Sequence, residues 1–215
     1  MKIAILCTSP AHPINPYLEG WMARNGHDHA ITLVRSVKEL DDGDLLFLIS
    51  CSEMVSAETR SRFRKTLVIH ASPLPEGRGW SPHIWQILAG KDQITVTLLE
   101  AEDRVDSGDI WHQVICDIPR HALWDEINAR IFDAELELMD FAVANFGTCR
   151  PQKQDASVAA TYFPKRSPVD SEISPELSLA SQFDLIRICD PDRFPAFFKH
   201  LGHTYTIKIE KVRNE

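Results

Sequence analysis

The chain has 215 residues, which is enough for one full domain and a small appendage. Its hydrophobic fraction of 44% is ordinary for a soluble globular protein, and no apolar run approaches the roughly 20 residues that span a bilayer. The formal net charge of −8 argues against broad binding to nucleic acid or to an anionic membrane surface. Because the sequence begins directly with an apolar strand and shows no signal segment, we expect a cytoplasmic protein with no membrane partner.

The cysteines are odd in number and scattered: Cys7, Cys51, Cys116, Cys149 and Cys189. None belongs to a C-x-x-C pair, so neither a zinc site nor a redox motif is indicated. We expect free thiols in a reducing compartment and no bound metal.

The first third of the chain alternates apolar runs with amphipathic ones. Strands are predicted at residues 2–7, 30–34, 45–50 and 66–69, and helices at 16–25 and 57–63. This alternation predicts an α/β fold with a mostly parallel twisted sheet flanked by helices. The turn at residues 8–10 lacks the glycines of a dinucleotide-binding loop, so a Rossmann cofactor site is disfavoured.

A histidine, His70, ends the strand predicted at 66–69, and a loop rich in proline and glycine follows it. Ser81 is a good helix N-cap, Pro82 suits the first helical position, and Gly90 ends the predicted helix. Binding sites of parallel sheets gather at the carboxyl ends of their strands. His70 and the loop at 51–54 are both predicted at such ends.

A further strand is predicted at 94–99, followed by an acidic loop that holds Asp106 and Asp109. The order of these elements predicts that an imidazole and a carboxylate lie near each other at the edge of the sheet. Asp109 is interpreted as a brace for its loop through bonds to backbone N–H groups.

The second half of the chain predicts one long helix and a mixed tail. The predicted elements are a strand at 113–118, a helix at 121–146, a polar loop at 152–159, a helix at 176–189, a turn at 190–197 and a last strand at 205–211.

Two motifs in this sequence resemble those of the folate-dependent formyltransferases. The first family motif, Asn-x-His followed by x-Ser-Leu-Leu-Pro and Arg-Gly, is similar to residues 68–75, which read Val-Ile-His-Ala-Ser-Pro-Leu-Pro, and then Arg78-Gly79. The second, Asp-x-Gly-Asp-Ile, is intact at residues 106–110. The segment Lys-Arg-Ser-Pro-Val-Asp at 165–170 resembles the region that follows the core in enzymes acting on tRNA or on nucleotide-linked amino sugars.

The resemblance implies a catalytic core at residues 1–150 and a packed extension at 151–215, truncated relative to the tRNA enzymes. It implies transfer of a formyl group from N10-formyltetrahydrofolate to an amine. Such a reaction needs a base for the amine proton and donors for the developing oxyanion. His70 is predicted to move the proton, and Asp106 is predicted to orient the imidazole of His70.

Further residues are assigned to ligands on the same basis. The residues predicted to hold the folate are Ser52, Glu53, Met54, Ala101, Asp103 and Asp106. The residues predicted to hold the acceptor are Arg78, Trp80, His83, Lys165 and Arg166. Other interpretations stand beside these: the tryptophan is an anchor of the core, Arg78 braces its loop, and the remaining three are surface residues.

One position departs from the family pattern. The asparagine that in the family hydrogen-bonds the formyl oxygen falls on Val68, which has no such donor. Loss of an oxyanion donor commonly costs about 10²–10³ in rate. Either another group such as Ser52 replaces it, or the local register differs, or the protein is a slow or inactive relative.

The acceptor predicted by the resemblance is the amine of a nucleotide-linked 4-amino sugar, such as a UDP-linked one on the pseudaminic-acid route of surface-glycan synthesis. Its nucleotide, UDP or dTDP, is left open. The alternatives are another amine such as methionyl-tRNA, and a non-catalytic relative that binds folate or nucleotide. A nucleic-acid partner is disfavoured by the acidic charge, and a homodimer is a possible assembly.

Overall fold

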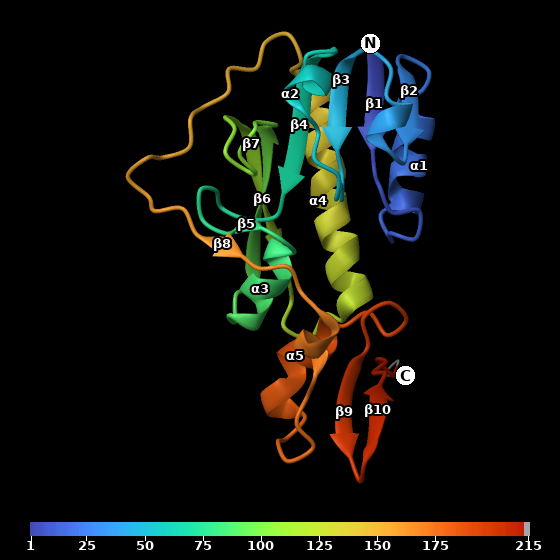
Figure 1. Ribbon diagram of the computed structural model, residues 1–215, viewed down its shortest axis with the longest axis vertical. Helices are drawn as coiled ribbons and strands as arrows, with labels where there is room; N and C mark the ends of the chain where they lie inside the picture. Colours follow the sequence, from blue (N-terminus) through green and yellow to red (C-terminus); the bar gives the residue numbers. More distant parts are fainter. Residues whose placement is uncertain (213–215) are drawn as a thin grey trace.

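The computed structural model describes residues 1–212, and its centre is a six-stranded sheet (Figure 1). The strands lie in the order β2-β1-β3-β4-β6-β7. Their bounds are β1 Lys2–Leu6, β2 Ala30–Val34, β3 Gly43–Leu48, β4 Phe63–His70, β6 Gln93–Glu100 and β7 Ile110–Asp117. The first four strands are parallel, whereas β6 runs antiparallel to β4, and β7 to β6. The mainly parallel α/β fold expected from the sequence is confirmed.

The apolar strands form the middle of a layered core, covered by helix α1 (Asn15–Asn25) and helix α4 (Trp124–Ala144). Trp21 of α1 is fully buried, and its ring meets that of Phe47 edge-on with centroids 6.1 Å apart. Its indole N–H donates to Asp140 Oδ1 at 2.6 Å, so the one polar atom of this large side chain is satisfied. This contact ties α1 to α4.

Three local features differ from the sequence prediction. The helix expected at 57–63 is shorter, because α2 spans Ala57–Arg60 and Phe63 already pairs with Gly43 in the sheet. The short 3₁₀ helix η1 (Val37–Glu39) was not predicted. Helix α3 (Pro82–Leu88) begins where expected, but Ser81 adopts φ 47° and its side chain makes no capping hydrogen bond.

A long segment without regular structure leaves α4 and returns along the far side of the molecule (Figure 1). It leads to strand β8 (Tyr162–Phe163), which pairs in parallel with the short strand β5 (Arg78–Gly79). The loop after His70 and the tail are thereby joined, although they lie far apart in the sequence. Among the described residues, no helix combines the length and the apolar character that crossing a bilayer requires.

The helix predicted at 176–189 is wrong in extent. The structure has two 3₁₀ helices, η2 (Pro168–Ser171) and η3 (Ala180–Gln182), and one short helix, α5 (Phe183–Arg187). In the residues before α5, side chains take backbone groups that a helix would use. Ser178 Oγ accepts from the N–H of Ser181, and the side chain of Gln182 bonds both backbone groups of Ser174. Arg187, 2% exposed, donates to the carbonyl of Ala122 at 3.2 Å and so connects the tail to the core.

The tail ends in a hairpin of β9 (Ala196–His200) and β10 (His203–Ile207), at the end of the molecule toward which β1, β3 and β4 point (Figure 1). One strand was predicted here, at 205–211, and the turn predicted at 190–197 overlaps only the first two residues of β9, which was not predicted as a strand. Leu201 and Gly202 have φ of 48° and 78°, the two positive values that a two-residue hairpin turn requires. An ordinary leucine in the first of those positions conceals the turn in the sequence.

Candidate active site

The histidine and the carboxylate predicted to meet do lie together. His70 is the last residue of β4, at the carboxyl end of the parallel part of the sheet. Its Nδ1 is 3.6 Å from Asp106 Oδ2, and both side chains are only 7% exposed. Burial weakens the screening of this pair by water, so charges on the two groups interact more strongly than they would at the surface.

Asp106 reaches His70 because its loop folds back over the sheet. Strand β6 ends at Glu100, which pairs with Leu67 and not with the end of β4. The return depends on Gly108, where an added Cβ would lie 1.9 Å from the carbonyl oxygen of Glu100. Asp106 itself takes φ 53°, a left-handed conformation that aspartate tolerates better than most residues. Sterics therefore explain the glycine of the Asp-x-Gly-Asp motif, because a side chain at Gly108 would collide with the backbone of Glu100.

The Arg-Gly pair at residues 78–79 supplies a hydrogen bond to the Asp106 carboxylate. The backbone N–H of Gly79 donates to Asp106 Oδ2 at 2.8 Å. Gly79 has φ 100°, and a Cβ there would lie 2.5 Å from the carbonyl oxygen of Phe163. Glycine at this position allows β5 and β8 to approach and leaves the amide free to bind Asp106.

The partners of the His70 ring assign its protons. Nε2 lies 2.8 Å from the carbonyl oxygen of Gly77, and because a carbonyl only accepts, Nε2 carries a proton. Nδ1 is then the nitrogen that takes up a further proton, and the resulting imidazolium lies beside the Asp106 carboxylate. This arrangement suits a general base whose charged form is stabilised by a fixed neighbour.

Arg78 is buried, with 7% exposure, and hydrogen-bonds two side chains of the segment that follows α4. It donates to Gln154 Oε1 at 2.6 Å and to the hydroxyl of Tyr162 at 3.2 Å. Arg104, from the Asp106 loop, also donates to that hydroxyl, and the two guanidinium groups lower the pKa of Tyr162. The loop-bracing interpretation of Arg78 matches these contacts, while direct contact with an acceptor stays a prediction.

Two predicted acceptor residues form one surface unit. Lys165 Nζ lies 4.8 Å from the centre of the Trp80 ring, which is 42% exposed. Trp85 stacks on Phe163 at 6.3 Å and donates to the carbonyl of Pro164 at 3.0 Å. Trp80 therefore presents an open aromatic face next to a cation, whereas Trp85 holds strand β8 in place.

A group of basic side chains surrounds the half-buried His83 near the start of α3. Burial lowers the pKa of His83 to about 4. The nearby charges of His12, His70 and Arg166 act in the same direction. Burial also lowers the pKa of His12 to about 4, with the charge of Arg193 contributing. Both imidazoles are therefore neutral at pH 7, and Arg166 supplies the positive charge.

The two loops predicted to hold the folate are adjacent. Arg60 forms an ion pair with Asp103 in the second loop and donates at 2.7 Å to the carbonyl of Val55, the residue that follows the first loop. Asp103 is thus engaged by Arg60, and Met54 is 70% exposed. Ala101 N–H donates to the carbonyl of Thr66 on β4.

The remaining predicted folate residues have partners within the chain. Glu53 accepts from the N–H of Val37 at 3.1 Å, away from the His70 pair. Ser52 Oγ is 3.0 Å from Thr8 Oγ1, which also accepts from the Ser52 N–H. The roles of these loops in binding folate stay predictions.

Val68 lies inside the sheet, half-buried, with Leu48 and Leu99 as its neighbours on the adjacent strands. The pairing of β4 with β3 and with β6 is regular at this residue. Two hydroxyls on this stretch, Thr66 Oγ1 and Ser72 Oγ, are buried without a hydrogen-bond partner among the described residues. Like Ser52, each of these side chains carries a hydroxyl that can donate a hydrogen bond.

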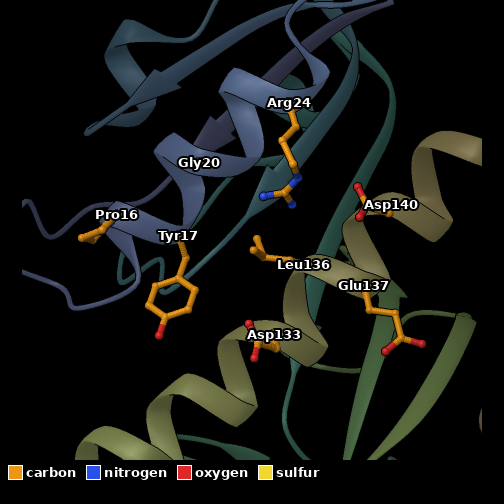
Figure 2. A pocket seen from close by; sticks show the side chains of 8 residues that line it. All are labelled: Pro16, Tyr17, Gly20, Arg24, Asp133, Leu136, Glu137 and Asp140. Carbon is orange, nitrogen blue, oxygen red and sulfur yellow. The ribbon is translucent and has the colours of Figure 1, made fainter.

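An open groove lies elsewhere, between α1 and α4 (Figure 2). It has a volume of about 570 Å³ and is lined by Pro16, Tyr17, Gly20, Arg24, Asp133, Leu136, Glu137 and Asp140. None of these residues belongs to the predicted site. Within residues 1–212, no cluster of three or more His, Cys, Asp or Glu side chains is arranged to hold a metal ion.

A buried imidazole and carboxylate held 3.6 Å apart at the carboxyl edge of an α/β sheet have the chemistry that a proton transfer needs. The formyl transferase family model matches residues 8–143, and the chain belongs to that family. A methionyl-tRNA formyltransferase of Natranaerobius thermophilus is 31% identical over 156 residues, covering 70% of this chain and 48% of that protein. The chain spans about half the length of the curated relatives it matches.

Solved structures share the fold. A methionyl-tRNA formyltransferase from Clostridium thermocellum superposes with TM-score 0.83 and 24% identity, over 99% of this chain and 94% of the other. HypX from Aquifex aeolicus, in complex with tetrahydrofolic acid, gives 0.78 and 21% over 95% of this chain and 36% of the other. A sugar N-formyltransferase from a Shewanella species gives 0.72 and 16%, over 99% of each chain.

Several residues of the site were not found from the sequence. Gln154 and Thr161 contact the loops that carry Asp106 and Gly77, and Arg104 binds Tyr162. The stretch at 152–159 shows a polar composition and no periodicity, so nothing local marks Gln154. Its partners lie more than forty residues away in the chain.

Proposed function

We propose that this protein transfers the formyl group of N10-formyltetrahydrofolate to an amine. The buried pair of His70 and Asp106 carries the proposal. The amine nitrogen attacks the formyl carbon, His70 Nδ1 takes the amine proton, and the bond between the formyl carbon and N10 of the folate breaks. The proton then passes to N10, which leaves as tetrahydrofolate. Asp106 stabilises the imidazolium between the two proton transfers.

Folate use is supported by the family and by the likeness to HypX in its tetrahydrofolic acid complex. The loops at 51–54 and 101–106, linked by the contacts of Arg60 with Val55 and Asp103, are the proposed folate site. No metal takes part in the proposed chemistry. The buried hydroxyls near Val68 are the candidates for the oxyanion donor, in place of the family asparagine.

The proposed acceptor is the 4-amino group of a nucleotide-linked sugar. Basic side chains contact aromatic ones in a chain whose net charge is −8: Arg104 binds the hydroxyl of Tyr162, and Lys165, next to Arg166 in the sequence, lies over the ring of Trp80. Such a surface suits a diphosphate and a planar base. The sugar N-formyltransferase from Shewanella and the methionyl-tRNA formyltransferase from Clostridium thermocellum both match along nearly their whole length, so the basic and aromatic side chains carry this choice.

Methionyl-tRNA is the second candidate acceptor, because the curated relatives are named methionyl-tRNA formyltransferases. One assay decides between them. The protein is incubated with N10-formyltetrahydrofolate and either a panel of UDP- and dTDP-linked amino sugars or methionyl-tRNA, and products are detected by mass spectrometry. A mass gain of one formyl group on a sugar nucleotide supports the proposal. Formylation of methionyl-tRNA alone replaces the acceptor. No formylation of any amine, with folate still bound, identifies a non-catalytic relative.

A further inference from the structure

The segment between α4 and β8 passes beside the Asp106 loop as it crosses the molecule (Figure 1). Gln152 pairs with Ile110 through both backbone groups, which holds the segment against the first residue of β7. Two residues later, the half-buried Gln154 turns its side chain toward the site. This region was a featureless loop in the sequence.

The Gln154 amide is bound at both of its atoms. Nε2 donates to the carbonyl oxygens of Asp106 at 2.8 Å and Gly108 at 2.9 Å. Oε1 accepts from Arg78 at 2.6 Å. The amide has one orientation only, because its oxygen must face the guanidinium and its nitrogen must face two acceptors. The buried cation therefore sets the direction of the two donors.

These bonds act on the residue that orients His70. The backbone of Asp106 is left-handed, a conformation that a non-glycine residue keeps only when its surroundings hold it. Gln154 Nε2 donates a hydrogen bond to the backbone carbonyl of Asp106, and the N–H of Gly79 donates one to its carboxylate. The carboxylate is thereby kept 3.6 Å from His70 Nδ1.

The same segment braces the other member of the pair. Thr161 Oγ1 accepts from the N–H of Gly77 at 2.8 Å, and the carbonyl of Gly77 binds His70 Nε2 at 2.8 Å. Gln154 and Thr161 thus reach the two sides of the imidazole from one stretch of chain. No other contact recorded among the described residues joins a side chain to the Asp106 carbonyl.

We propose that Gln154 is a positioning residue for proton transfer, which holds Asp106 in the conformation that presents its carboxylate to His70. Gln154 does not touch the reacting atoms and acts through Asp106. The inference rests on the proposed function for its kinetic consequence. The geometry that it predicts for His70 is independent of the acceptor.

The test compares Gln154→Leu with Gln152→Leu, the same substitution at an exposed neighbour whose side chain makes no hydrogen bond in the part of the chain that the structure describes. With the acceptor in hand, we expect Gln154→Leu to lower kcat by about 10- to 100-fold, with little change in KM for the folate. We also expect its pH–rate profile to move in the same direction as that of Asp106→Asn. Gln152→Leu should match wild type in both.

A second readout does not depend on turnover. NMR titration of the His70 ring nitrogens is carried out on wild type, Gln154→Leu, Gln152→Leu and Asp106→Asn. We expect the His70 midpoint of Gln154→Leu to move from the wild-type value toward that of Asp106→Asn. If Asp106→Asn moves the midpoint and a folded Gln154→Leu leaves it at the wild-type value, Gln154 does not position the pair. If the midpoint moves as expected but no amine is formylated by wild type, the proposed function fails and the positioning role stands.

Discussion

Glu135 forms no ion pair with any of the residues that the structure describes, and burial disfavours its charged form. It lies on the inward side of α4, half-buried, near Cys7 at the end of β1. Burial raises the pKa of Glu135 from 4.5 to about 8. Because the folded pKa is the higher one, the folded state is favoured below pH 4.5, and stability falls as the pH rises from there to about 8.

The size of this loss follows from the two pKa values. Ionising the group in the unfolded chain alone lowers stability by 1.36 kcal/mol for each pH unit, so pH 7 costs about 3 kcal/mol relative to pH 4.5. Partial exposure of the carboxyl reduces this to roughly 2 kcal/mol. Glu135→Gln keeps the shape and removes the charge. We therefore expect it to be more stable than wild type by about 2 kcal/mol at pH 7 and nearly equal to it at pH 4.5.

Urea unfolding followed by circular dichroism at pH 4.5, 6 and 7.5 measures the difference. Glu137→Gln, two residues along the same helix and exposed, is the matched control and should change stability by less than about 0.5 kcal/mol at every pH. A gain for Glu135→Gln that is the same at all three pH values would refute the reasoning, because it would not arise from ionisation.

Three further predictions concern the site. His70→Asn should lower kcat by at least ~10² with an unchanged melting temperature, and near-normal turnover of the folded variant would remove His70 from the mechanism. Val68→Asn should leave kcat unchanged or lower it, since an unpaired amide in an apolar setting costs roughly 1–3 kcal/mol; a tenfold gain would show that no other donor replaces the asparagine. A crystal soaked with a folate analogue should show density along residues 51–54 and 101–106, whereas density near residues 8–12 would place the folate elsewhere.

The elements with strong local patterns were predicted well from the sequence. The strand at 30–34 has the predicted bounds, and the helix α1 differs from its prediction by one residue. Buried strands and amphipathic helices depend on hydrophobic periodicity, which short stretches of sequence carry by themselves. The tail before α5 and the turn at Leu201 were missed, because side-chain hydrogen bonds and an unusual φ shape them and neither leaves a hydrophobic periodicity in the sequence.

The order of strands and loops in the sequence also predicted that His70 lies near a carboxylate of the loop that holds Asp106 and Asp109, and the resemblance to the formyltransferases pointed to Asp106. The sequence did not identify how the pair is held. The antiparallel course of β6 takes its end away from His70, and only the tight approach of Gly108 to Glu100 brings Asp106 back. That return is a contact between backbone atoms, which no periodicity records.

What only the tertiary structure decided is the support around the pair. Arg60 binds both Val55 and Asp103, which are far apart in the chain, and Gln154 binds Asp106 across 48 residues. Hydrogen bonds of this kind depend on where the chain has been carried by the packing of its core. A single polar residue in a loop has no local partner to reveal it, so its role appears only when the fold brings that partner within 3 Å.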